Sequence, residues 1–213
     1  MTHRRYGLTI AAVTAAALLA GCQSGGASPL SLDGLTKTVD GMPPRGADSC
    51  PLPYDLTKAA KTAGVDAPTG PGPVKDTGEP LATGDGGKNA PPGSPLAENP
   101  GALVSCTFHI GQEDLEVRTV VTRNPSAGNQ LAPLTQQLAG MSLDDLTAYM
   151  KQVGEAETGE PVVTGSGNVA GVRLKPDGDG DAYLLVSVGE DGRTSLGRAK
   201  VESLASALAD QVQ

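Results

Sequence analysis

Two neighbouring stretches, ALVSCTFHI (residues 102–110) and LEVRTVVTR (residues 115–123), decide the fold class. Both are rich in residues that favour strands, and the Gly-Gln-Glu-Asp sequence between them is typical of a hairpin connection. From Leu115 to Val121, apolar and mostly polar side chains alternate, which is the period of a strand with one buried face. The two stretches therefore predict an antiparallel β-hairpin.

Further helix and strand patterns lie on both sides of this hairpin. An apolar face with an acidic first turn predicts a short helix that begins just after Cys50 and ends at Gly64. After the hairpin, the sequence predicts helices over 131–138 and 143–153, strands over 161–164, 168–174 and 181–189, and a last helix over about 195–209. Strands in hairpins with helices at both ends predict an α+β fold, an antiparallel β-sheet flanked by helices.

The N-terminal residues predict export. Residues 1–21 contain Arg4 and Arg5, then an apolar run and no acidic residue, which is the organisation of a secretory signal peptide. The apolar run is too short, and its side chains are too small, for a stable transmembrane helix. The region around the two arginines also partly resembles a twin-arginine signal, so export by the Sec route and by the twin-arginine route both stay open.

The signal ends in Leu-Ala-Gly-Cys22, which resembles the bacterial lipobox. This resemblance implies that Cys22 is the lipidation site and the first mature residue, carrying acyl chains such as palmitate. The alternative is an ordinary signal peptide with a chance cysteine. Two or three acyl chains on one residue give stable anchoring. We therefore expect a secreted lipoprotein attached to the cell membrane by its lipid, on the extracytoplasmic face.

The rest of the chain divides into a tether and one domain. Residues 22–47 are rich in Gly, Ser and Pro without a sustained period, and they predict a flexible tether. Residues 48–213 are expected to form a single α+β domain. Within it, residues 65–101 are dense in Pro and Gly and nearly lack large apolar residues, which predicts a long surface loop. A loop of this length is either functional or disordered, and of the two we favour disorder.

The cysteines and the charge limit the possible partners. With Cys22 lipidated, Cys50 and Cys106 are left as one pair, which is expected to form a disulfide in an oxidising compartment. The alternatives are two free thiols or a redox pair, but neither cysteine lies in a C-x-x-C pattern. Removal of residues 1–21 leaves 14 basic and 24 acidic residues. This acidic balance argues against nucleic acid and anionic lipid as partners.

Three aspartates at alternate positions, Asp177, Asp179 and Asp181, are a weak candidate for a metal site. An EF-hand loop counted from Asp177 needs glycine at position six and a carboxylate at position twelve, where this chain has Ala182 and Val188. The Pro-Asp-Gly-Asp-Gly sequence also suits a hairpin turn. We therefore predict a turn, with no obligatory metal and no cofactor.

No catalytic residues are predicted. His109 is the only histidine after the signal peptide, and it falls in a predicted strand. Ser166 lacks the glycine that a hydrolase elbow needs at position 164, and the glycines around it match only a loosened dinucleotide fingerprint without a following helix. Two acidic clusters could supply paired carboxylates for glycosidic hydrolysis; they are Glu113, Asp114 and Glu116, and Glu155, Glu157 and Glu160.

The order of these features resembles a known family. A lipobox, a tether, Cys50 before a short helix, a Pro/Gly loop, and Cys106 followed by Thr107 and Phe108 at a strand are together similar to actinobacterial secreted lipoproteins of a family without an assigned activity. The resemblance covers about residues 48–213. It implies a PsbP-like fold, an antiparallel sheet flanked by helices, and it supplies no catalytic residues.

Two functions fit the sequence. The first is a non-catalytic binding or accessory module on a membrane anchor, with an unknown protein or small-molecule ligand. It follows from the predicted anchor, the predicted disulfide and the lack of a catalytic motif. The alternative is a cell-envelope hydrolase that uses scattered carboxylates. A pocket with converging carboxylates would favour the hydrolase, and shallow grooves would favour the binding module.

Overall fold

The computed structural model describes residues 29–75, 77–190 and 192–213. Its strands are β1 (Thr69–Pro71), β2 (Ala82–Gly86), β3 (Gly101–Ile110), β4 (Glu113–Thr122), β5 (Pro161–Val163), β6 (Val169–Leu174) and β7 (Asp181–Val188). Its α-helices are α1 (Leu32–Gly41), α2 (Leu56–Thr62), α3 (Pro95–Glu98), α4 (Ala132–Ala139), α5 (Leu143–Glu155) and α6 (Arg198–Ala209), and two 3-10 helices are η1 (Gly87–Asn89) and η2 (Ala127–Leu131). The predicted α+β fold is confirmed.

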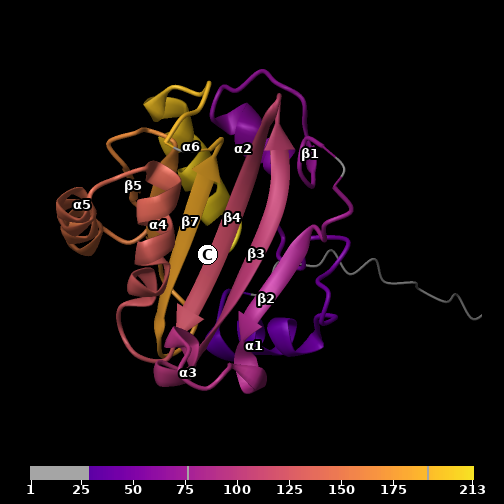
Figure 1. Cartoon of the computed structure of the whole chain (residues 1–213), viewed down its shortest axis with the longest axis vertical. Coiled ribbons are helices and arrows are strands. Elements are labelled where there is room, and N and C mark those ends of the chain that lie inside the picture. Colours follow the sequence, from indigo (N-terminus) through magenta and orange to yellow (C-terminus); the bar gives the residue numbers. More distant parts are fainter. Residues whose placement is uncertain (1–28, 76, 191) are drawn as a thin grey trace, which may run out of the picture.

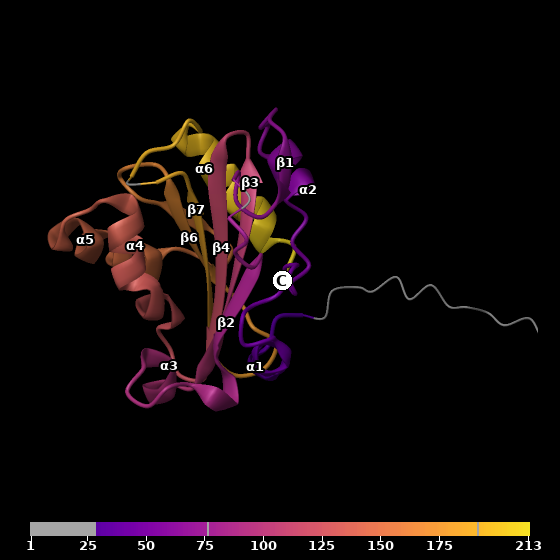
Figure 2. The same cartoon turned by 45° about the vertical axis from the view of Figure 1, so that its right-hand side comes forward.

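The strands form one seven-stranded antiparallel sheet with helices on both faces (Figure 1). The strand order is β1-β3-β4-β7-β6-β5, and β2 also pairs with β3. Turned by 45°, the molecule shows three layers, with α4 and α5 on one side of the sheet and α1, α2 and α6 on the other (Figure 2). No helix in the described parts of the chain is long and apolar enough to span a membrane.

The predicted hairpin is confirmed as β3 and β4, which lie in the middle of the sheet. The pairing runs from Gly101 opposite Thr122 to Ile110 opposite Glu113. Gly111 has a φ of +63°, a left-handed conformation that glycine adopts without strain at the turn. On the other side β4 pairs with β7, so the hairpin is joined to the C-terminal strands.

The alternating side chains of the strands supply two cores, one on each face of the sheet. Leu115 and Val117 of β4 belong to the first core, beneath α1, α2 and α6. Val120 of the same strand faces the second, smaller core, which η2, α4 and α5 cover. Both faces of the sheet are therefore buried over most of its area, which is why β7 reads as a nearly continuous apolar run.

The second core contains two buried tyrosines whose hydroxyl groups lie side by side next to a glycine. The hydroxyl groups of Tyr149 on α5 and Tyr183 on β7 are 3.2 Å apart, and Tyr149 also donates to the carbonyl of Val162. Burial raises the pKa of Tyr149 to about 12 and raises the pKa of Tyr183 as well, so both phenols are neutral. Gly171 on β6 leaves the space for these hydroxyls, because a Cβ there would lie 1.7 Å from the Tyr183 oxygen.

The predicted flexible tether is wrong in its described part, residues 29–47, because Leu30 and α1 pack against the sheet there. Ser31 caps α1 by accepting a hydrogen bond from the Gly34 amide at 3.1 Å. Leu35 on this helix is only 2% exposed and lies in the first core. Leu32, Leu35 and Val39 do follow a helical period, but the pattern is short and is surrounded by Gly, Ser and Pro.

The predicted disorder of residues 65–101 is wrong where the structure describes this segment. The segment contains β1, β2, η1 and α3, and β2 pairs with β3 from Ala82 opposite Cys106 to Gly86 opposite Ala102. Backbone pairing of this kind needs no large apolar side chains. Gly84 in β2 is close to α1, since a Cβ there would lie 2.9 Å from the Met42 sulfur. The Pro/Gly segment is therefore a surface connection that extends the sheet.

Candidate functional site

The structure describes two of the three residues that carry the predicted covalent modifications. Cys22, the predicted lipidation site, lies outside the described residues. Cys50 and Cys106 form a disulfide with a sulfur–sulfur distance of 2.02 Å and a Cα–Cα distance of 5.4 Å. The predicted disulfide is therefore confirmed, and it joins the segment before α2 to the centre of β3.

The three aspartates lie at the β6–β7 hairpin, and their contacts differ. The carboxylate of Asp181 accepts hydrogen bonds from the amides of Ser126 and Ala127, at 2.8 and 2.7 Å, and so holds the start of η2. The backbone amide of Asp177 donates to the carbonyl of Leu30 at 2.7 Å. Among the described residues, no three His, Cys, Asp or Glu side chains are grouped as a metal ion requires. The predicted turn is confirmed, with Gly178 and Gly180 at positive φ.

We expect the aspartates to contribute unequally to stability. Asp181→Ala should lower the free energy of unfolding by about 1 to 3 kcal/mol, because it leaves two amides without their acceptor. Asp177→Asn with Asp179→Asn should change it by no more than about 0.5 kcal/mol. Urea denaturation with added calcium and with a chelator measures both effects. Equal losses in the two variants, or stabilisation by micromolar calcium, would contradict this assignment.

The three carboxylates of the first acidic cluster each bond to a different partner. Glu113 accepts a hydrogen bond from the Ser195 amide at 2.8 Å, before α6. Asp114 accepts from the amide of Val74 at 2.6 Å. Glu116 forms an ion pair with Arg118, two residues along the same strand. Glu113 and Asp114 therefore hold two separate segments against the β3–β4 turn, and Glu116 is paired within β4.

The other predicted candidates also have local partners. Glu155 pairs with Lys151 one helical turn away, at 3.8 Å on the surface of α5, and Glu160 accepts from the amide of Glu157. His109 is half-buried, with its Nδ1 3.2 Å from the carbonyl oxygen of Gly72. The hydroxyl of Ser166 donates to the side-chain oxygen of Asn168 within the turn between β5 and β6, and β6 rather than a helix follows the glycines there.

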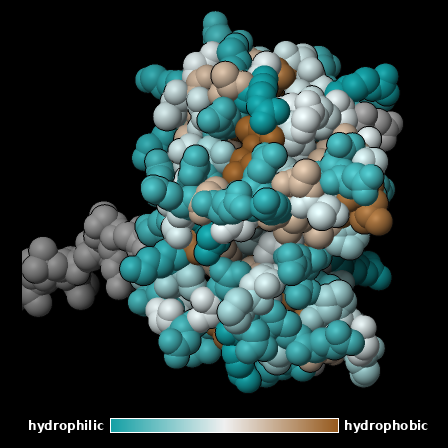
Figure 3. All heavy atoms as spheres, turned by 90° about the vertical axis from the view of Figure 1, so that its left-hand side faces the viewer, coloured by the Kyte–Doolittle hydropathy of each residue, from teal (hydrophilic) through white to brown (hydrophobic). Residues whose placement is uncertain are grey.

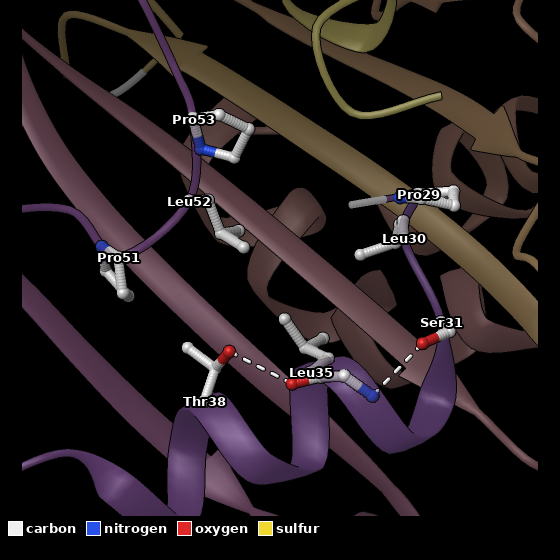
Figure 4. Close-up of a pocket in the computed structure, with 9 residues that line it drawn as sticks. Pro29, Leu30, Ser31, Leu35, Thr38, Pro51, Leu52 and Pro53 are labelled. Carbon is white, nitrogen blue, oxygen red and sulfur yellow. Dashed lines mark hydrogen bonds between the residues drawn. The ribbon is translucent and has the colours of Figure 1, made fainter. Parts of the chain in front are cut away.

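An apolar groove lies where the described chain begins (Figure 4). Its volume is about 450 Å³, within the usual range for small-molecule sites. One wall is the N-terminal part of α1 with the residues before it, and the other is the segment that follows Cys50. The apolar side chains of the lining are Pro29, Leu30, Leu35, Pro51, Leu52 and Pro53.

The polar groups of this groove are already engaged within the protein. The hydroxyl of Ser31 caps α1, and the hydroxyl of Thr38 donates to the Gly34 carbonyl at 3.0 Å, as the dashed lines in Figure 4 show. The amide of Leu30 donates to Val212 and its carbonyl accepts from Asp177. None of the described residues that line the groove is charged. The groove therefore presents more apolar than polar surface, and the polar groups named above have partners within the protein.

Both walls of the groove are fixed to the body of the domain. The Leu30 side chain is buried in the first core, and its backbone bonds tie it to the end of α6 and to the β6–β7 turn. The second wall, Pro51–Pro53, directly follows Cys50 and is therefore held to β3 by the disulfide. The groove is thus formed before any ligand enters it, which lowers the ordering cost of binding.

Other hollows in the described surface have mixed or charged linings. One, with a volume of about 500 Å³, lies beside the β3–β4 turn and includes Glu113, Asp114 and Glu190. Another, of about 450 Å³, lies between α5 and the β5–β6 turn and includes Asp145 and Arg198. The side of the molecule formed by α4 and α5 is mostly hydrophilic, with small hydrophobic areas (Figure 3).

The fold and the groove together define a class, an α+β domain with the Cys50–Cys106 disulfide and an apolar groove beside the start of α1. Comparisons with known proteins found no match, since no family model fits the chain and no curated protein or solved structure is significantly similar to it. The resemblance to actinobacterial secreted lipoproteins with a PsbP-like domain therefore stays a prediction.

Proposed function

We propose that this chain is a lipoprotein, held by Cys22 on the extracytoplasmic face of the cell membrane, whose folded domain is a non-catalytic binding module. The observation that carries the proposal is that Leu30 and α1, only a few residues after Cys22 in the sequence, already pack against the domain and line an apolar groove. A fully extended chain spans about 3.5 Å per residue. The seven residues from Cys22 to Pro29 therefore keep the groove within roughly 25 Å of the lipid.

The groove supports binding rather than catalysis. None of the described residues that line it has a titratable side chain that could act as a general acid or base, and the hydroxyls of Ser31 and Thr38 are bonded within α1. The carboxylates on which the alternative hydrolase would depend have structural partners, as Glu113, Asp114 and Glu116 illustrate. The hollow beside the β3–β4 turn does contain Glu113, Asp114 and Glu190. Glu113 and Asp114 are engaged there by the backbone amides of Ser195 and Val74, which supports structural roles rather than acid–base catalysis.

The anchor is tested by replacing the predicted lipidation site. Cys22→Ala should release the protein from the membrane fraction into the medium, or leave it uncleaved, because the acyl chains provide the membrane affinity. Fractionation and intact mass of the wild type and the variant measure this. Cys50→Ala serves as the matched control, because it removes a cysteine of the domain and leaves Cys22 in place. Processing and detergent-dependent solubility of Cys22→Ala equal to those of the wild type would refute the anchor.

A further inference from the structure

We propose that the groove between α1 and Pro51–Pro53 binds one acyl chain of a lipid from the leaflet in which the protein is anchored. This inference rests on the proposed function, since it places the groove beside a membrane. It adds the chemical class of the ligand, a saturated or unsaturated hydrocarbon chain, and its source.

The lining favours hydrocarbon over a peptide. A peptide that docks along a groove needs partners for its own amides and carbonyls. Three of the lining residues, Pro29, Pro51 and Pro53, have no amide hydrogen to donate. The amide and the carbonyl of Leu30 are both bonded within the domain. A hydrocarbon chain has no such requirement and fits a lining of this kind without an unpaired polar group.

The free energy of binding an acyl chain in the groove comes from the burial of apolar surface. A lipid chain that moves from the bilayer into the groove exchanges one apolar environment for another, so its own transfer contributes little. The gain comes from the exposed prolines of the groove and from the half-buried Leu52, whose apolar surface is removed from water when the chain covers it. Leaflet lipids are present in large excess over the acyl chains on Cys22, so mass action favours them as the source.

The test uses the processed, lipidated full chain reconstituted into phosphatidylcholine vesicles. A small fraction of the phosphatidylcholine carries a diazirine at the end of one acyl chain, and irradiation is followed by peptide mapping. We expect label on the peptides that contain Leu35 and Leu52. Leu52→Gln and, separately, Pro53→Glu should reduce this label about tenfold, because a polar or charged group in the lining opposes hydrocarbon. Pro53 is exposed, so its replacement leaves the cores intact.

The matched control is Leu143→Glu, which changes an exposed leucine on α5, on the other side of the sheet from α1. Leu143 is 67% exposed, and its replacement should leave the labelling unchanged. Label spread over the surface, or equal label in Pro53→Glu and the wild type, would overturn the inference. So would a cross-link to the groove from a diazirine placed in the acyl chains on Cys22 itself, because the source would then be the protein's own lipid.

The proposed function and this inference fail in different ways. A wild-type chain that does not float with the vesicles contradicts the anchor and, with it, the inference. A chain that floats but carries no label at the groove contradicts the acyl-chain site alone and leaves the membrane-anchored module in place.

Discussion

Gly171→Ala should lower the free energy of unfolding by about 4 kcal/mol, the sum of an overpacking cost and the cost of separating a buried hydrogen-bonded pair. The new Cβ would lie 1.7 Å from the Tyr183 oxygen and 2.5 Å from the Tyr149 oxygen. Neither ring can move aside easily, because both tyrosines are buried between the sheet and α5. Urea or thermal denaturation of the purified domain in its oxidised form measures the loss.

Two further variants separate this clash from a general effect of alanine. Gly154→Ala on α5 is the matched control, because a Cβ there meets nothing within 4 Å. Alanine also favours a helix over glycine by up to about 1 kcal/mol, so this variant should be as stable as the wild type or more stable. Tyr183→Leu should cost less in the Gly171→Ala background than alone. Additive losses in that double-mutant cycle would contradict a direct contact between positions 171 and 183.

Loss of the disulfide should lower the free energy of unfolding by about as much as Gly171→Ala does. Cys50→Ala with Cys106→Ala should lower the free energy of unfolding by about 4 kcal/mol, because the bond closes a loop of about 57 residues in the unfolded chain. For a domain of this length the melting temperature should fall by roughly 10 °C. Calorimetry under oxidising conditions measures the change.

A reducing agent provides the internal control for the disulfide prediction. It should lower the melting temperature of the wild type to that of the double variant and leave the double variant unchanged. Because Pro51–Pro53 follows Cys50 directly, both treatments should also loosen one wall of the groove. Equal melting of the wild type with and without reductant would contradict a stabilising bond.

The parts of the fold that the sequence predicts correctly are those in which side chains repeat with a clear period. The β3–β4 hairpin follows from alternation between Leu115 and Val121, and α5 follows from a capping serine and an apolar stripe. The chain has three cysteines, so once Cys22 is assigned to the lipid, Cys50 and Cys106 are left as the one possible pair. These signals are local, so they do not depend on knowing the rest of the fold.

What the sequence does not predict depends on contacts between distant residues. β2 consists largely of glycine and small or polar residues and is a strand because β3 offers it a backbone to pair with. α1 is stabilised by the burial of Leu35, which its Gly-rich surroundings do not indicate. The groove combines residues on both sides of Cys50, and its first wall lies in a segment with the composition of a tether. Each of these features requires the assembled sheet.

The sheet also divides the domain into two parts that can open separately. η2, α4 and α5 form one continuous segment, residues 127–155, and cover only the second core. Local opening of this segment exposes the smaller core while the larger one stays closed, so it costs less free energy than global unfolding. Amide hydrogens of α5 can therefore exchange with solvent through such local opening, whereas those of α6 depend on the larger core. The groove lies against the larger core, so we expect opening of the outer helices to leave its shape unchanged.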